Sequence, residues 1–213
     1  MNKSFEIKVC GINDEISMST ALECKADYIG LVFYKNSPRN ISINLSRKLL
    51  KSRNKFSKIV ALTVNPNDEF LFEIKKTVAP DFIQLHGNEN PRRCLDIKNE
   101  LNIPIIKGIN VINKINLMKL TKDFEDICDI LLLDAPREAL PGGNGKKFDW
   151  NILKDFKSKK KWMLAGGLNI KNIQKALDIT KAPAIDISSG IEVEKGVKDP
   201  KLIEDFIIKC RNF

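Results

Sequence analysis

The sequence predicts an α/β protein, a single-domain (β/α)8 TIM barrel, and two observations support this prediction. Eight short apolar runs recur along the chain, and a helix-like amphipathic segment follows each of them. The chain has 213 residues, a normal length for one such barrel. A doubly wound open sheet is the competing architecture, but it usually has fewer strands and a glycine fingerprint after the first. No linker or repeat divides the chain, so residues 1–213 are expected to form one catalytic domain.

The predicted strands are nearly continuous in apolar content, as expected for a parallel sheet that helices cover. They occupy residues 7–12, 28–33, 59–64, 82–87, 104–109, 130–135, 162–167 and 184–190. In a barrel of this class the catalytic groups stand at the carboxyl ends of the strands. Reactive residue types occur at those ends here, and they are therefore candidates for a site.

The predicted helices occupy residues 14–25, 44–54, 67–78, 90–101, 113–124, 149–158, 169–180 and 199–210. The segment 67–78 is typical: an Asn-Asp start and an acidic first turn are followed by lysines at its end, which matches the helix dipole. One long connection, 136–147, follows the sixth strand, and loops of this length usually serve a site. Leu140 and Lys147 occupy positions that a P-loop needs for glycine and Ser/Thr, so a glycine-hinged lid is the favoured interpretation.

Composition narrows the possible partners. Hydrophobic residues make up 43% of the chain and charged residues 30%, as in globular proteins. The sequence shows neither a signal peptide nor an apolar stretch of about 20 residues, so we expect a cytoplasmic protein with no membrane partner. The net charge of +9 is spread along the chain, without interleaved aromatic residues in its densest run at 157–162. We therefore expect no nucleic-acid partner, and a basic surface that attracts anionic substrates.

The cysteines and the single histidine argue against metal chemistry. The five cysteines are odd in number, far apart and never arranged as C-x-x-C, which disfavours both a disulfide framework and a zinc site. One histidine excludes a histidine-rich centre. No metal site is predicted.

Two glycine-rich turns follow the last two predicted strands, "AGGLN" at 165–169 and "DISSG" at 186–190. Many barrels bind phosphate with these two loops, because backbone N–H groups and small hydroxyls can approach the anion closely. The turns could also be merely tight, but their place favours a phosphate site.

Four further residues have both a structural and a functional interpretation. Asp134 ends "ILLLD" and either caps the next turn or serves as a general acid kept protonated by desolvation. His86 either packs in the core or lines the pocket, and Arg39 is either an ordinary surface residue or a two-pronged clamp for a carboxylate. Cys10 alone would be a packing thiol, but it accompanies the other candidates, several of which also stand at strand ends.

Taken together, six segments of the chain resemble the phosphoribosylanthranilate isomerase family of tryptophan biosynthesis. They are "KVCGIND", "ADYIGLVFYKNSPRNIS", "DFIQLHGNE", "LLLDA…PGGNGKKFDW", "LAGGLN" and "DISSGIEVEKGVKDP". The resemblance runs in order along nearly the whole chain, and agreement at all of these motifs by chance is implausible. Lys147 and Asn36 depart from the residues that the family usually has.

The resemblance implies a (β/α)8 barrel that catalyses an Amadori rearrangement of an aminoaldose without a cofactor. It implies that Cys10 is the general base, Asp134 the general acid and Arg39 the ligand of the anthranilate carboxylate. His86 would line the pocket and Asp186 would meet sugar hydroxyls. The phosphate would be held by Gly166, Gly167, Ser188, Ser189 and Gly190. The implied partner is a phosphosugar substrate, and the chain is expected to be a monomer or a homodimer.

The chemistry sets a condition on the thiol. A free cysteine has a pKa of about 8.5, so a base at this position needs a lowered pKa or the help of an adjacent iminium ion. Two other functions remain open: the related aminoaldose isomerase of the histidine pathway, whose chemistry favours an aspartate where Cys10 stands, and a phosphosugar-binding protein without catalysis.

Overall fold

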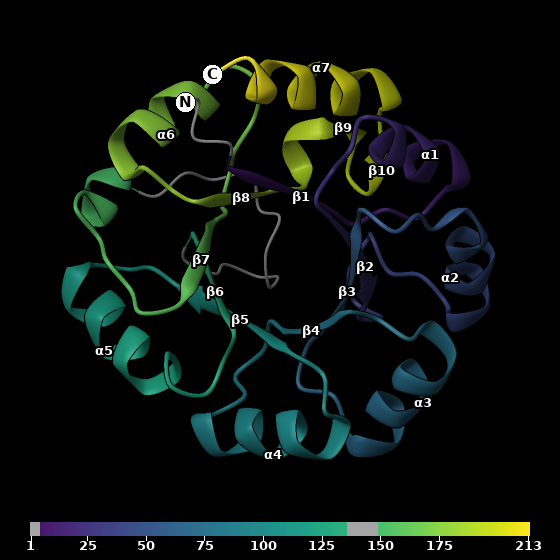
Figure 1. Cartoon of the computed structure of the whole chain (residues 1–213), viewed down its shortest axis with the longest axis horizontal. Helices are drawn as coiled ribbons and strands as arrows, with labels where there is room; N and C mark the ends of the chain where they lie inside the picture. Colours follow the sequence, from purple (N-terminus) through teal and green to yellow (C-terminus); the bar gives the residue numbers. More distant parts are fainter. Residues whose placement is uncertain (1–4, 136–148) are drawn as a thin grey trace.

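The computed structural model describes residues 5–135 and 149–213, and these form a closed barrel of eight parallel strands in the order β1 to β8. Helices surround the barrel, as Figure 1 shows. The strands are β1 (Glu6–Cys10), β2 (Tyr28–Phe33), β3 (Lys58–Thr63), β4 (Phe82–Leu85), β5 (Ile105–Asn110), β6 (Ile130–Asp134), β7 (Lys161–Leu164) and β8 (Ala184–Ile187). The predicted fold class is confirmed, and each predicted strand is present with ends shifted by a few residues.

The helices between the strands follow the predicted amphipathic segments. They are α1 (Glu15–Glu23), α2 (Ile43–Leu49), α3 (Asp68–Val78), α4 (Pro91–Leu101), α5 (Lys114–Phe124), α6 (Ile173–Thr180) and α7 (Pro200–Arg211). Side chains of polar residues before the first turn cap most of them, for example Asn67 accepting from the N–H of Phe70. These caps explain why the helices begin where the sequence pattern predicts.

The predicted helix at 149–158 is wrong. In the described part of the connection between β6 and β7, the chain forms only a short 3-10 helix, Trp150–Leu153. Lys154 leaves the helical region with ψ of 126°, and Asp155 lies in the left-handed region with φ of 61°, so the helical turn cannot continue. The predicted lid at 136–147 lies outside the described residues.

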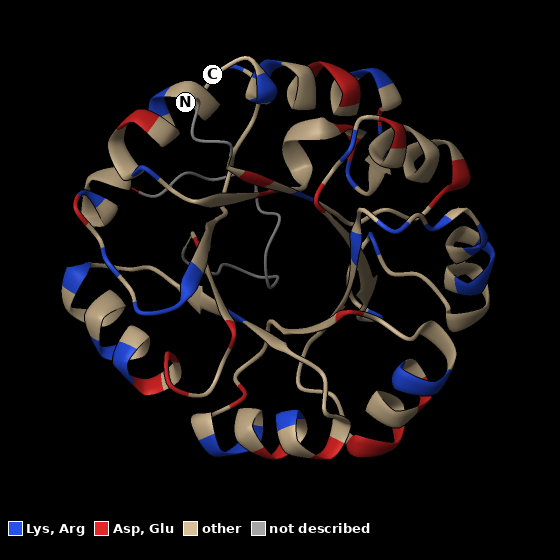
Figure 2. Ribbon diagram, viewed as in Figure 1, with Lys and Arg blue, Asp and Glu red and all other residues tan. Residues whose placement is uncertain are grey.

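A two-stranded hairpin, β9 (Glu192–Glu194) and β10 (Val197–Lys198), follows β8 and was not predicted. Its side chains take part in the site below. The ring of helices carries charges of both signs, and blue and red segments both occur around it in Figure 2. Among the residues of the described ranges, no helix combines the length and the apolar character needed to cross a bilayer.

Side chains alternate along each strand between the barrel interior and the layer beneath the helices. The interior is filled by a cluster of apolar residues that includes Val60, Ile106, Leu132 and Met163. On β1, β4, β6 and β8 the inward-facing residues towards the carboxyl end are polar or reactive, and these line a pocket. The polar end of the barrel is therefore built from inward-facing residues spaced by two.

Candidate active site

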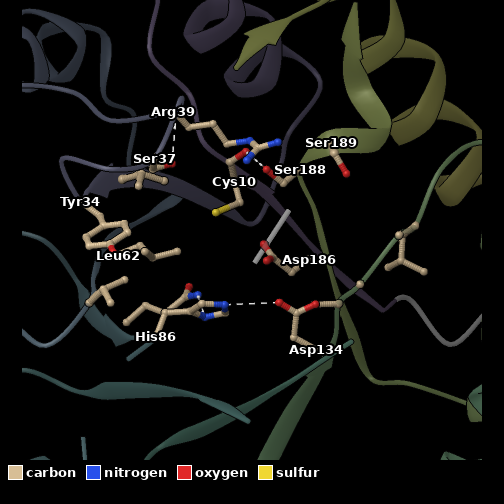
Figure 3. A pocket seen from close by; sticks show the side chains of 17 residues that line it. Cys10, Tyr34, Ser37, Arg39, Leu62, His86, Asp134, Asp186, Ser188 and Ser189 are labelled. Carbon is tan, nitrogen blue, oxygen red and sulfur yellow. Dashed lines mark hydrogen bonds and ion pairs between the residues drawn. The ribbon is translucent and has the colours of Figure 1, made fainter. Parts of the chain in front are cut away.

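A pocket lies at the carboxyl ends of the barrel strands and holds about 620 Å³ of empty space, part of it open solvent. Nine of the predicted site residues line it, as the close view in Figure 3 illustrates for most of them. They are Cys10, Arg39, His86, Asp134, Gly166, Gly167, Asp186, Ser188 and Ser189. Residues far apart in the sequence thus meet in one cavity.

Cys10 and Asp134 occupy opposite sides of this pocket. Each is the last residue of its strand, β1 for Cys10 and β6 for Asp134, and β7 and β8 lie between these strands on the shorter way around the barrel. Both side chains are directed into the pocket in Figure 3, and both residues are buried. A small molecule between them would have a thiol on one face and a carboxyl group on the other.

The Asp134 carboxyl group is oriented by its surroundings. Its Oδ1 accepts from the N–H of Ala135 at 2.8 Å, and its Oδ2 lies 3.3 Å from Nε2 of His86. Gln84, on the floor of the pocket, lies 3.1 Å from the other ring nitrogen of His86. With Gln84 Nε2 as donor, Nδ1 accepts, and the imidazole carries a hydrogen on Nε2, facing Asp134.

Lys8 lies beneath Cys10, fully buried, with Nζ 2.8 Å from Oδ1 of Asp186. Burial opposes the charge of this lysine, but Asp186 and Cys10 together hold its pKa above the usual value. Burial raises the pKa of the Cys10 thiol, and Lys8 acts in the opposite direction without cancelling it. The pKa of the Cys10 thiol is therefore raised, not lowered as the predicted chemistry favours.

Arg39 reaches the pocket from the loop after β2 and is held by Glu192 of the hairpin. Its Nε and Nη2 donate to the two carboxylate oxygens of Glu192 at 2.6 and 2.8 Å. Lys198, on the neighbouring strand, donates to the same carboxylate at 2.7 Å and to the carbonyl oxygen of Ser188 at 2.9 Å. Gly11 leaves the room for this arginine, because a Cβ there would lie 2.7 Å from Arg39 Cδ.

The two glycine-rich turns lie next to each other at the rim of the pocket. Gly166 and Gly167 have φ of 88° and 65°, a region that favours glycine, and a Cβ on Gly166 would lie 3.0 Å from Oδ1 of Asp134. Gly190 does not line the pocket among the described residues. Its Cα instead packs so closely on the carbonyl oxygen of Leu168 that a Cβ has no room. Gly190 therefore brings the two turns together.

Sequence reasoning missed four residues of the site: Lys8, Gln84, Glu192 and Lys198. The first two lie two positions before Cys10 and His86, on the same inward face of their strands. A polar residue inside an otherwise apolar strand, two positions before a candidate, was the available signal. Glu192 and Lys198 lie in the segment "DISSGIEVEKGVKDP" that resembles the family, but their contact with a loop about 150 residues away could not be inferred from that segment alone.

The fold and the site together define a (β/α)8 barrel with a thiol and a carboxyl group in one pocket, beside the two glycine-rich turns that follow its last two strands. A family model described as N-(5'phosphoribosyl)anthranilate (PRA) isomerase matches residues 7–209. The chain belongs to this isomerase family.

Similar proteins agree along nearly the whole chain. A protein of Rhizobium rhizogenes named N-(5'-phosphoribosyl)anthranilate isomerase is 43% identical over 204 residues, which cover 94% of this chain and 91% of the relative. One of Rhodopseudomonas palustris with the same name is 39% identical, covering 97% and 95% of the two chains. Both alignments therefore span more than nine tenths of each chain.

Solved structures give the same result. The crystal structure of phosphoribosyl anthranilate isomerase from Thermotoga maritima superposes with a TM-score of 0.87 at 29% identity, covering 98% of this chain and 100% of that one. A phosphoribosyl anthranilate isomerase in complex with reduced 1-(o-carboxyphenylamino)-1-deoxyribulose 5-phosphate has a TM-score of 0.82 at 29% identity, with the same coverage of both chains.

Proposed function

We propose that this chain isomerises N-(5'-phosphoribosyl)anthranilate to 1-(2-carboxyphenylamino)-1-deoxyribulose 5-phosphate in tryptophan biosynthesis, with Cys10 as general base and Asp134 as general acid. The isomerase function follows from the family, and the assignment of roles to residues is the part proposed from the site. The observation that supports these roles most directly is the placement of the two groups on opposite sides of one pocket. A ligand related to the product occupies a solved member of the family.

The first step opens the sugar ring. Asp134 gives its proton to the furanose ring oxygen, the bond from that oxygen to C1' breaks, and the nitrogen lone pair forms an iminium ion at C1'. Gly166 and the N–H of Ala135 hold the carboxyl group in place. His86 faces Oδ2 and stabilises the carboxylate that remains after proton transfer.

The second step moves the hydrogen of C2'. The iminium charge acidifies that C–H bond, and the thiolate of Cys10 removes the proton from the face opposite Asp134. The electron pair of the C–H bond becomes the C1'–C2' double bond of an enolamine. The enol hydroxyl then loses its proton, C1' gains one, and the aminoketose results. Electrons pass from C2' to C1' within the molecule, so the balance requires no external oxidant or reductant.

The rest of the pocket matches the rest of the substrate. The turns at Gly166–Gly167 and Ser188–Ser189 would hold the phosphate, and Asp186 would accept from sugar hydroxyls. Val32, Leu62 and Val64 form an apolar wall next to Cys10, against which an aromatic ring would pack. Arg39, oriented by Glu192, would bind the carboxylate of that ring.

The remaining expectations stay predictions. A solved structure concerns monomers made from a dimeric phosphoribosylanthranilate isomerase of Thermotoga maritima, and we propose that this chain is a monomer or a homodimer. A single catalytic domain over 1–213, a cytoplasmic location and the lack of a nucleic-acid partner are predicted from the sequence.

The test is turnover by the purified protein, followed as loss of the fluorescence of phosphoribosylanthranilate, with Cys10→Ala measured beside the wild type. The proposal expects turnover by the wild type only. The aminoaldose of the histidine pathway serves as the competing substrate in a second assay. Preference for that substrate would overturn the proposed specificity, and binding without turnover of either would favour a non-catalytic phosphosugar-binding protein.

A further inference from the structure

Lys8 is an unusual residue for the interior of a barrel. It lies in β1 two positions before Cys10, on the same inward face, and it is completely buried. Lysine is almost never fully buried unless a charged partner compensates it. The partner here is Asp186 of β8, 2.8 Å from Nζ.

The ammonium group of Lys8 also lies beside the thiol of Cys10. Both groups occupy the space above Gly30 of β2, where a Cβ would lie 2.9 Å from Cys10 Sγ and 3.0 Å from Lys8 Nζ. Two atoms that are each about 3 Å from one point lie within about 6 Å of each other, a range in which a buried pair of opposite charges interacts strongly. Gly30 is thus the place where the base and the lysine meet.

The other groups that face Cys10 are negatively charged, positively charged or apolar. Asp186 contributes a negative charge from β8, and Lys198 a positive one from β10. His86 and Asp134 lie across the pocket. Val32 of β2 and Leu62 of β3 are apolar. Burial is the largest influence and raises the thiol pKa, and the Lys8 ammonium is the largest one that lowers it.

We propose that Lys8 is a positioning residue of the reaction: its ammonium group, held by Asp186 under the pocket floor, supplies the countercharge against which the Cys10 thiolate forms. The inference rests on the proposed role of Cys10 as base. Lys8 does not touch the substrate in this account. It acts through the sulfur.

The arrangement of Lys8, Asp186 and Cys10 predicts an effect on the thiol that would not be expected if Lys8 only stabilised the fold. Asp186 and Cys10 share one ammonium group, so a negative charge on Asp186 disfavours a negative charge on the sulfur. Removing the charge of Lys8 must therefore make the thiolate harder to form, and removing the charge of Asp186 must make it easier. A lysine that only stabilises the fold would not produce opposite effects.

The experiment is alkylation of the free enzyme by iodoacetamide between pH 6 and 10, with the rate at Cys10 followed by mass spectrometry of its peptide. The variants are Lys8→Met, Asp186→Asn and the double variant. Because the thiolate is the reacting species, a shift of one pH unit in the midpoint changes the rate about tenfold on the acidic side. Cys24, a partly exposed thiol outside the pocket, serves as the internal reference in every sample.

The expected result is a midpoint at higher pH and an alkylation rate at least about tenfold lower near neutrality for Lys8→Met. Asp186→Asn should shift the midpoint to lower pH, and the double variant should lie between the two single ones. In kinetics, the acidic limb of the kcat profile of Lys8→Met should move with the thiol midpoint while KM changes little. Unchanged midpoints, or shifts of the same sign in both single variants, would overturn the proposal.

Lys8→Met leaves Asp186 buried without its partner and could fail to fold. In that case Asp186→Asn alone decides: an unchanged or higher midpoint rejects the proposal, and a lower one supports it. The failure of the proposed function has a different signature, because Cys10→Ala would then retain turnover. If Cys10→Ala abolishes turnover but the alkylation midpoints do not shift, the role proposed for Lys8 is wrong and the role of Cys10 stands.

Discussion

Both carboxylate oxygens of Glu192 accept hydrogen bonds from Arg39, at 2.6 Å from Nε and 2.8 Å from Nη2. The pair is almost fully buried, with side chains 7% and 4% exposed. Glu192 belongs to the hairpin after β8, so its contact with Arg39 joins this hairpin to the loop after β2. Lys198 of the same hairpin binds the same carboxylate. The orientation of the arginine thus depends on a residue that does not line the pocket.

Glu192→Gln should weaken substrate binding. An amide keeps only one of the two accepting oxygens and removes the negative charge that Glu192 places beside Arg39 and Lys198, so Arg39 loses its two-oxygen support. We expect KM to rise by about tenfold, with kcat within about threefold of the wild type, as for an interaction made equally in the ground and transition states. Initial rates over a range of substrate concentrations measure this. An unchanged KM would mean that Arg39 needs no such support.

Arg39→Ala should also act mainly on KM. The change removes the group proposed to bind the substrate carboxylate, and a charge-assisted pair of this kind contributes about 1.5–3 kcal/mol, equivalent to about tenfold to a hundredfold in KM. Arg47→Ala, at an exposed position of α2, is the matched control and should behave like the wild type. Normal kinetics for the Arg39 variant would remove it from the site.

Gly108→Ala should lower kcat. The α-carbon of Gly108 in β5 packs against the ring of His86, and an added Cβ would collide with Nδ1. The ring must move away from Asp134 or from Gln84, so we expect kcat to fall by about tenfold and the free energy of unfolding by about 1–3 kcal/mol. Steady-state kinetics and urea unfolding measure the two effects. A variant with normal kcat would show that the position of His86 is not critical.

Acid should destabilise the fold through two buried glutamates. Burial favours their protonated form, but Lys107 beside Glu89, and Arg39 and Lys198 beside Glu192, bring the pKa of both carboxyls below the usual value. A carboxyl with a lower pKa in the folded state contributes stability that is fully present above its unfolded pKa, about 4.3, and is lost as the pH falls through the folded value.

Urea unfolding at pH 7, 5, 4 and 3 measures this contribution. The free energy of unfolding should decline below about pH 4.5, and Glu192→Gln should decline less steeply than the wild type while starting from a lower value. Glu100→Gln, at an exposed position of α4, should leave the slope unchanged. A slope for Glu192→Gln equal to that of the wild type would show that this carboxyl does not contribute to the acid sensitivity.

The barrel was predictable because the strands of a parallel sheet are apolar on both faces, and runs such as "ILLLD" stand out from the helical segments. The segment 149–158 has the same amphipathic composition as the true helices, yet Asp155 adopts a left-handed backbone that ends the turn. That conformation depends on the surrounding structure, and composition does not reveal it. The sequence pattern therefore predicted the order of the strands and helices, but it wrongly predicted an α-helix at 149–158.

The site was predictable mainly at the rim of the barrel, and of the residues one layer deeper only Asp186, which pairs in register with Lys8, was predicted. Cys10, His86 and Asp134 stand at the strand ends, where the fold puts reactive groups, whereas Lys8 and Gln84 lie one layer deeper. Glu192 and Lys198 belong to a hairpin whose contacts join distant segments. The segment "DISSGIEVEKGVKDP" contains both residues, but only the folded chain shows that they contact Arg39 and Ser188.

The central claim is that Cys10 and Asp134 act as base and acid across one bound sugar. Its most direct test is kcat for Cys10→Ala and Asp134→Asn beside the wild type, together with the affinity of each variant for the reduced product analogue. The account predicts that each variant loses at least about a hundredfold in kcat and keeps its affinity within about threefold. Turnover within a few-fold of the wild type in either variant would contradict it.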